Sequence, residues 1–345
     1  MLNCKTDIKQ NIRESNIELL RIVAMFAILF WHGIHHGLLH NPAFTSIDIK
    51  VLSIVRYLLI WHVDVFLLIT GFWGIKFKWI KVFKFYGYVL LYFVILSVTI
   101  SLFKCASIDY RAVLYAPYTF FNDWLGWWFV KPYLYLLLIS PLIEKIRNIS
   151  NKEYMLILIP FIVLNIVIGH FLHGGYNNNG FCVEHFVFMY ILGMGLKRFK
   201  DDLRIKNINS WLIISGVIVN TIILYILRVL VGYENIDGYN NPLIILNAML
   251  LLLLFERIEI QSSFINAVAG SAFAVYLVTD NAFLTRSYIV SITNKIVEIF
   301  DANVFVVLLV WFLVCVLIYT GCTLCDIVIR YSLSAFKSCI LKKPA

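Results

Sequence analysis

Apolar runs separated by short polar segments extend along almost the whole chain of 345 residues. An α-helix needs about 17–25 mainly apolar residues to cross a bilayer, and runs of roughly this length recur throughout. The expected spans lie near residues 16–36, 51–72, 86–103, 126–143, 154–172, 183–197, 211–231, 242–256, 264–285 and 303–325. The pattern therefore predicts an all-α integral membrane protein, with about ten transmembrane helices in a single bundle that forms one domain over residues 1–345.

The basic residues predict how these helices are oriented. Of the 29 Lys and Arg, 20 precede the first expected span, follow the second, fourth, sixth and eighth spans, or lie in the tail of residues 326–345. Loops on the cytoplasmic side of a membrane carry such an excess. Both termini are therefore expected in the cytoplasm, the number of spans is expected to be even, and the tail is expected to be a basic cytoplasmic segment.

Composition excludes an ordinary soluble protein. A soluble domain carries about 25% charged residues, whereas this chain has 14%, with 61% hydrophobic residues and a mean hydropathy of +0.85. The basic loops account for most of the net charge of +9. The expected neighbour of the chain is therefore the lipid bilayer, with anionic lipid near the basic loops, and nucleic acid is not expected.

Three ionisable side chains lie in residues 16–32 of the first expected span: Glu18, Arg21 and His32. Arg21 and His32 are eleven residues apart, so at about 100° per residue they share one helix face, with a rise of ~16 Å between them. Glu18 precedes Arg21 by three residues and can pair with it. Charged groups within a membrane usually face a cavity and mark a site, so this face predicts function. In the alternative reading, Arg21 extends to the membrane surface and His32 is interfacial.

Two other expected spans carry an aspartate. Asp64 lies in "WHVDVFLLITGFWG" (61–74), and Asp280 lies in "AVYLVTDNAFLTR" (274–286). Neither is expected to face lipid, and either could orient an imidazole or pair with an arginine. The His-rich loop around "HGGYNNNG" (173–180) has no ligand set with a fixed helical spacing, so no metal is predicted.

The ordered set of motifs resembles the membrane acyltransferase 3 family, multi-spanning O-acyltransferases that modify bacterial surface glycans and some small molecules. The signature of its first span is an acidic residue, an Arg three residues on and a His eleven residues after that, here Glu18, Arg21 and His32. Further segments that resemble family segments are "VDVFLLITGF" (63–72), "WWFVKPYLYLLLISPLI" (127–143), "FMYILGMGL" (188–196) and "YLVTDNAFLTR" (276–286).

The resemblance implies an enzyme of the bacterial cytoplasmic (inner) membrane. It would transfer an acyl group, with acetyl the first expectation, from acyl-CoA to a hydroxyl of a cell-surface glycan or its lipid-linked precursor. His32 would be the general base and Glu18 would orient Arg21. Asp64 or Asp280 would orient His32 or hold the hydroxyl groups of the acceptor.

The donor is expected to be bound by cationic side chains near the cytoplasmic face. Arg21, Lys81 and Lys84 would hold the phosphates of acetyl-CoA or another acyl-CoA. The sequence departs from the family pattern at three places, because the family usually has Asp for Glu18, Arg-x-x-Arg for Lys81 and Lys84, and His for Thr279. The lysines keep the charge but lose the bidentate geometry of arginine. If the usual His shapes the acceptor site, Thr279 predicts a different acceptor or a different reaction rate.

Two other classes of membrane protein remain open. Ionisable residues within spans also mark the pathways of transporters, so a transporter or flippase of a glycan or its precursor is the alternative. The sequence has no duplicated pattern that would support it. A glycan polymerase of the membrane is a second alternative, but the large extracytoplasmic loop expected of such an enzyme is absent from this sequence.

Overall fold

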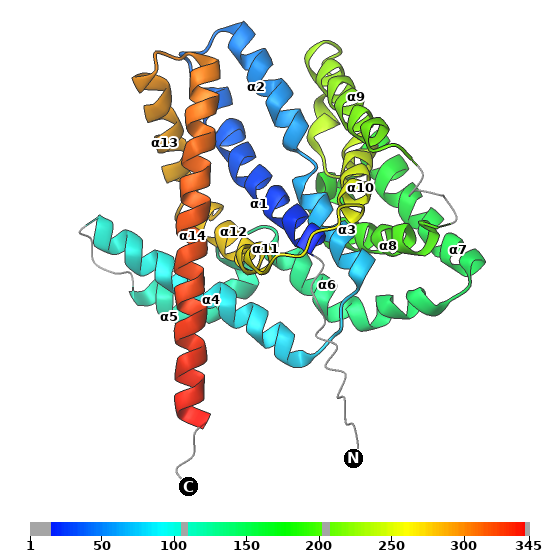
Figure 1. Ribbon diagram of the computed structural model, residues 1–345, viewed down its shortest axis with the longest axis horizontal. Coiled ribbons are helices and arrows are strands. Elements are labelled where there is room, and N and C mark those ends of the chain that lie inside the picture. The colour runs from blue at the N-terminus through cyan, green and yellow to red at the C-terminus, as the bar shows by residue number, and fades with distance from the viewer. Residues whose placement is uncertain (1–14, 105–109, 202–207, 342–345) are drawn as a thin grey trace, which may run out of the picture.

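The computed structural model describes residues 15–104, 110–201 and 208–341, and within these ranges every regular element is a helix (Figure 1). Residues 1–14, 202–207 and 342–345, which hold part of the basic residues that predict orientation, lie outside the described ranges. The α-helices are α1 (Ser15–His36), α2 (Ser46–Leu59), α3 (His62–Trp73), α4 (Trp79–Phe103), α5 (Tyr110–Asp123), α6 (Val130–Ile143), α7 (Asn151–Ile162), α8 (Val183–Phe199), α9 (Ser210–Val229), α10 (Pro242–Glu256), α11 (Ser263–Ala269), α12 (Ala272–Thr279), α13 (Arg286–Ile299) and α14 (Val304–Leu341).

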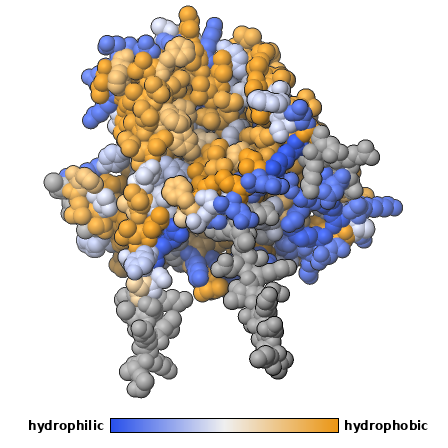
Figure 2. All heavy atoms as spheres, viewed as in Figure 1, coloured by the Kyte–Doolittle hydropathy of each residue, from blue (hydrophilic) through white to orange (hydrophobic). Residues whose placement is uncertain are grey.

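Seven helical segments of the described residues are long and apolar enough to cross a membrane. They are Ser15–His40, Ser46–Trp73, Trp79–Phe103, Asn151–Phe171, Ser210–Val229, Glu234–Glu256 and Val304–Ala335. Figure 2 shows apolar residues over most of the upper part of the molecule, while polar residues gather at the lower right. Water does not favour so large an apolar surface, so the chain is a multi-pass membrane protein.

The count of ten spans is not confirmed, because three of the expected spans form shorter helices. The span expected near 126–143 is reduced to α6, of 14 residues, since the chain turns at Leu125 and Gly126 with positive φ before the helix begins. The span near 183–197 is α8, of 17 residues, and the span near 264–285 is divided into α11 and α12. Most residues of α8 and α12 are buried by neighbouring helices, which a hydropathy pattern does not distinguish from burial in lipid.

α1 is the central helix, and α2, α3, α10, α11, α12, α13 and α14 all pack against it. The contact with α14 is close because a Cβ at Gly33 would lie 2.2 Å from the ring of Trp311, whose Nε1 donates to the carbonyl of Phe30 at 3.0 Å. α1 and α14 run in opposite directions (Figure 1), so the Ser15 end of α1 and the Leu341 end of α14 point toward the same side. Which side of the membrane that is stays a prediction.

α3 lies between α1 and α8. Its crossing with α8 depends on two glycines, since a Cβ at Gly71 would lie 2.0 Å from the carbonyl oxygen of Tyr190 and a Cβ at Gly193 would lie 2.4 Å from that of Leu68. Small residues at helix crossings in membranes allow the backbones to approach in this way. The crossing holds α3 against α8, and the first turn of α3 carries His62 and Asp64, both buried.

Candidate active site

A cavity of about 360 Å³ follows one face of α1, and its lining also includes residues of α3, α4, α6 and α12, residues next to the ends of α6 and α12, and Tyr239 before α10. Arg21 and His32 both line it, which confirms that they share a face directed at an internal space. Much of the remaining lining is aromatic: Phe66, Phe85, Phe129, Tyr133, Phe273 and Tyr276. The cavity therefore joins a cationic group to an imidazole through an apolar passage, and its volume lies in the range of small-molecule sites.

Arg21 is held by Glu18, as the sequence predicts. The guanidinium donates to Oε1 of Glu18 at 2.8 Å. Glu18 is buried, while the side chain of Arg21 keeps 28% of its surface exposed. The ion pair therefore holds the guanidinium in place, and Arg21 stays partly exposed where it lines the cavity.

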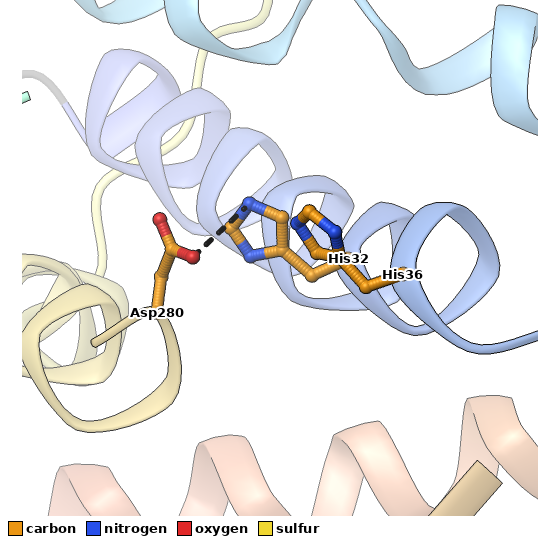
Figure 3. A group of neighbouring side chains, drawn as sticks. All are labelled: His32, His36 and Asp280. Atoms are coloured by element: carbon orange, nitrogen blue, oxygen red, sulfur yellow. Dashed lines mark ion pairs between the residues drawn. The ribbon is translucent and has the colours of Figure 1, made fainter. Parts of the chain in front are cut away.

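His32 lines another part of the same cavity and faces the carboxylate of Asp280. Its Nε2 is 3.7 Å from Oδ1 of Asp280, and Figure 3 shows the two side chains pointing toward each other. The guanidinium of Arg286 donates to the same Oδ1 at 2.7 Å, which fixes the carboxylate. Nδ1 of His32 is buried and has no hydrogen-bond partner among the described residues. The carboxylate therefore faces one ring nitrogen at a distance longer than a hydrogen bond, and the other ring nitrogen is buried without a partner in the described residues.

The position of Asp280 results from the way α12 ends. The side-chain amide of Asn281 donates to the carbonyl of Leu125 at 2.7 Å, and its oxygen accepts from the backbone N–H groups of residues 283–284, each at 2.9 Å. Asn side chains favour such turns because they compete with the backbone for hydrogen bonds. The helix stops at Thr279, and Asp280 leaves it facing α1.

Asp64 is paired with His185 and does not line the cavity. Nε2 of His185 is 2.9 Å from Oδ1 of Asp64, and both side chains are fully buried between α3 and α8. Of the two carboxylates that the sequence offers as partners for His32, the structure therefore brings Asp280 to the imidazole and places Asp64 elsewhere. His62, two residues before Asp64, does line the cavity.

Lys81 and Lys84 are exposed near the start of α4. Nζ of Lys81 donates to the carbonyl of Lys76 at 2.6 Å, and neither lysine lines the cavity, although the neighbouring Phe85 does. Their contact with CoA phosphates stays a prediction. Thr279, which replaces the usual His of the family, is buried and donates its hydroxyl to its own helix, to the carbonyl oxygen four residues earlier.

His36 lies one turn after His32, and the sequence analysis missed it although a spacing of four residues on a helix was the available signal. Potential ligand atoms of His32, His36 and Asp280 all lie within 4.8 Å of one another (Figure 3), a grouping that could hold a divalent metal ion. The guanidinium of Arg286 on the same carboxylate opposes a second positive charge there. The electrostatics favour a proton-transfer site, and the absence of a metal stays a prediction.

Comparison with known proteins gives one match. Residues 14–327 fit a family model described as an acyltransferase domain. The matched range includes Glu18, Arg21, His32 and Asp280, and it covers nearly the whole chain. The searches of curated proteins and of solved structures gave no match.

Proposed function

The chain belongs to the acyltransferase 3 family, and from this premise we propose that it is a membrane O-acyltransferase that acts on a cell-surface glycan or its lipid-linked precursor. Acyl-CoA, with acetyl-CoA the first choice, would be the donor. One observation carries the proposal: a single cavity joins the guanidinium of Arg21 to the imidazole of His32, which faces a fixed carboxylate. The proposed location is a bacterial cytoplasmic (inner) membrane. Both termini of the chain would lie in the cytoplasm, the compartment in which acyl-CoA is made.

The lining of the cavity, with Arg21 at one place and aromatic rings between Arg21 and His32, suits a donor with a charged head and a long thin arm. Arg21 would bind a phosphate of CoA through charge-assisted hydrogen bonds. The aromatic passage would take the pantetheine arm. The rise of ~16 Å along α1 between Arg21 and His32 is of the order of that arm, so the thioester would lie beside the imidazole.

His32 would act as the general base of a direct transfer. The acceptor hydroxyl oxygen attacks the thioester carbonyl carbon, forming the ester C–O bond, and the C–S bond breaks. The hydroxyl proton passes to Nδ1 of His32 and from there to the leaving CoA thiolate, so charge and protons balance. Asp280 would hold the other ring nitrogen and stabilise the imidazolium that forms, while Arg286 keeps the carboxylate in place.

Acyl transfer by the purified protein tests this function. The protein in lipid nanodiscs is incubated with acetyl-CoA labelled in the acetyl group and with the lipid-linked glycans of the same cells, and base-labile labelled ester is measured. We expect ester from the wild type, no detectable ester from His32→Ala, and wild-type yield from His40→Ala, which removes an exposed imidazole outside the cavity. Undiminished ester formation by His32→Ala would remove His32 as the base. Failure of the wild type with acetyl-CoA and with succinyl-CoA would overturn the function itself.

A further inference from the structure

A second cavity, of about 160 Å³, adjoins the first one. Tyr239 lines both cavities. Trp31 and His35 of α1 line the second cavity, whereas His32 lines the first, so the candidate base lies where α1 passes between the two spaces. The donor described above would fill only the first cavity, which leaves the second without an assigned ligand.

Two buried hydrogen-bond donors of the second cavity have no acceptor. Trp31 and Arg56 both line it and are 9% and 8% exposed. Nε1 of Trp31 and Nε of Arg56 are buried and have no hydrogen-bond partner in the part of the chain that the structure describes. Buried polar groups in native proteins are nearly always satisfied. Neither atom is accessible from the cavity as the side chains lie, so a ligand with oxygen acceptors, such as the hydroxyls and ring oxygen of a sugar, would satisfy them after a change of rotamer.

The charged side chains that line the second cavity carry a net negative charge, although the guanidinium of Arg228 lies beside Glu234 and donates to its backbone carbonyl at 3.3 Å. Arg56 is neutralised by Asp237, with NH2 of Arg56 2.8 Å from Oδ2, and Oδ1 of Asp237 accepts from the hydroxyl of Tyr57 at 2.9 Å. Glu234 adds a further carboxylate to the lining, and no ion pair of Glu234 is found within the described ranges. An anionic ligand would therefore be repelled, while a neutral or cationic one would not.

We propose that this second cavity binds the acceptor, and that the acceptor is a neutral or cationic sugar or polyol. The proposal rests on the proposed function and adds the place and the chemical class of the acceptor. The amide side chains of Asn179 and Asn235 supply further hydrogen bonds to hydroxyls, and the ring of Phe181 supplies an apolar surface. The acceptor hydroxyl enters past Tyr239 to His32, where its oxygen takes the acyl group and its proton goes, through the imidazole, to the CoA thiolate.

Charge selectivity is the first test. The protein in nanodiscs receives saturating acetyl-CoA and one of three probes: methyl glucoside, methyl glucosaminide or methyl glucuronide. We expect kcat/KM for O-acetylation of the neutral and cationic probes to exceed that of the glucuronide by about two- to fivefold, because Glu234 is exposed and solvent screens its charge. Glu234→Gln should reduce this preference, and Glu259→Gln, which removes an exposed carboxylate that does not line the cavity, should leave it unchanged.

Trp31→Phe is the second test, because it removes one N–H group that has no partner and keeps an aromatic ring. The expected result is a rise of about three- to tenfold in the KM for methyl glucoside, the value of one hydrogen bond, with the KM for acetyl-CoA unchanged. Trp211→Phe is the matched control, since Trp211 is 74% exposed and lines neither cavity. Thermal unfolding of both variants should match the wild type.

Binding without the donor separates the two proposals. Saturation-transfer NMR with methyl glucoside and no acetyl-CoA should give a signal for the wild type and for His32→Ala, and a weaker one for Trp31→Phe. If the wild type binds the glycoside but transfers no acyl group, the proposed function is contradicted and the sugar site is still supported. Equal use of the glucuronide, no binding of any probe, or a Trp31→Phe effect confined to the KM for acetyl-CoA would overturn the acceptor site.

Discussion

Two pairs of an imidazole and a carboxylate lie in the described part of the bundle, and they differ in closeness and in access. His185 and Asp64 are 2.9 Å apart, fully buried, and line neither cavity. His32 and Asp280 are 3.7 Å apart, and both line the larger cavity. Catalytic hydrogen bonds are often long before substrate binds, so the shorter distance does not identify the active pair. Access to a cavity is the difference on which we propose chemistry for His32 and Asp280 and packing for His185 and Asp64.

Removal of the accessible imidazole should have the largest effect. His32→Ala is expected to lower the rate of acyl transfer by about 10²–10⁴-fold, the usual contribution of a general base. The amount of protein in the membrane should not change, because Nε2 of His32 is too far from Asp280 for a strong hydrogen bond. Transfer rate and membrane yield are measured on the same preparation, and a loss of both together would contradict this assignment.

Asp280→Asn should have the next largest effect on the rate. The amide keeps the size of the side chain but loses the charge that stabilises an imidazolium, so we expect a loss of up to about 10²-fold in kcat. The KM for acyl-CoA should stay close to that of the wild type. A pH–rate profile of the variant is the decisive readout, since a purely structural role for Asp280 would lower kcat without moving the profile.

Arg21→Ala acts at the far end of the same cavity. Loss of a charge-assisted hydrogen bond to phosphate is expected to raise the KM for acyl-CoA by about tenfold or more. Lys81→Ala is the comparison, because Lys81 is exposed and does not line the cavity, and its effect should be smaller. An unchanged KM for acyl-CoA in Arg21→Ala would refute the phosphate contact.

The buried pair should respond in stability and not in rate. His185→Phe leaves the carboxylate of Asp64 buried without its partner, which is expected to lower the free energy of unfolding by about 1–3 kcal/mol. Thermal unfolding in detergent measures this loss. The second change Asp64→Leu should recover part of it, because both polar groups are then absent. A normal melting temperature combined with lost transfer activity would move catalysis to the buried pair.

His36→Ala should have the smallest effect. If His32 acts as a base, neither this change nor a chelator such as EDTA should reduce acyl transfer. Three results together would identify His32, His36 and Asp280 as a metal site and replace the general-base assignment. They are loss of activity on chelation, its recovery with zinc, and no activity in His36→Ala.

The features that follow from helical periodicity could be predicted from the sequence. Arg21 is three positions after Glu18, and His32 is eleven positions after Arg21. On one helix, these spacings give an ion pair and a shared face. Membrane class and the all-helical fold follow in the same way from composition and the length of apolar runs.

Other features depend on contacts between distant segments. Asp280 faces His32 because Asn281 ends α12 with a bond to Leu125, 156 residues away, and Asp64 finds its partner 121 residues away. No local pattern encodes either contact. The count of ten spans was not confirmed for a related reason, since α6, α8 and α12 are apolar but short, and other helices cover most residues of α8 and α12.

The most direct test of the central claim compares surface polysaccharides of the source cell after deletion of this gene. Wild type or His32→Ala is restored to the deletion strain, and acyl groups on the polysaccharide are measured by mass spectrometry. We predict polysaccharide that is present but lacks one acyl group, which wild type restores and His32→Ala does not. Polysaccharide missing from the surface, with normal acylation of what the cell retains, would contradict acyl transfer and favour a transporter.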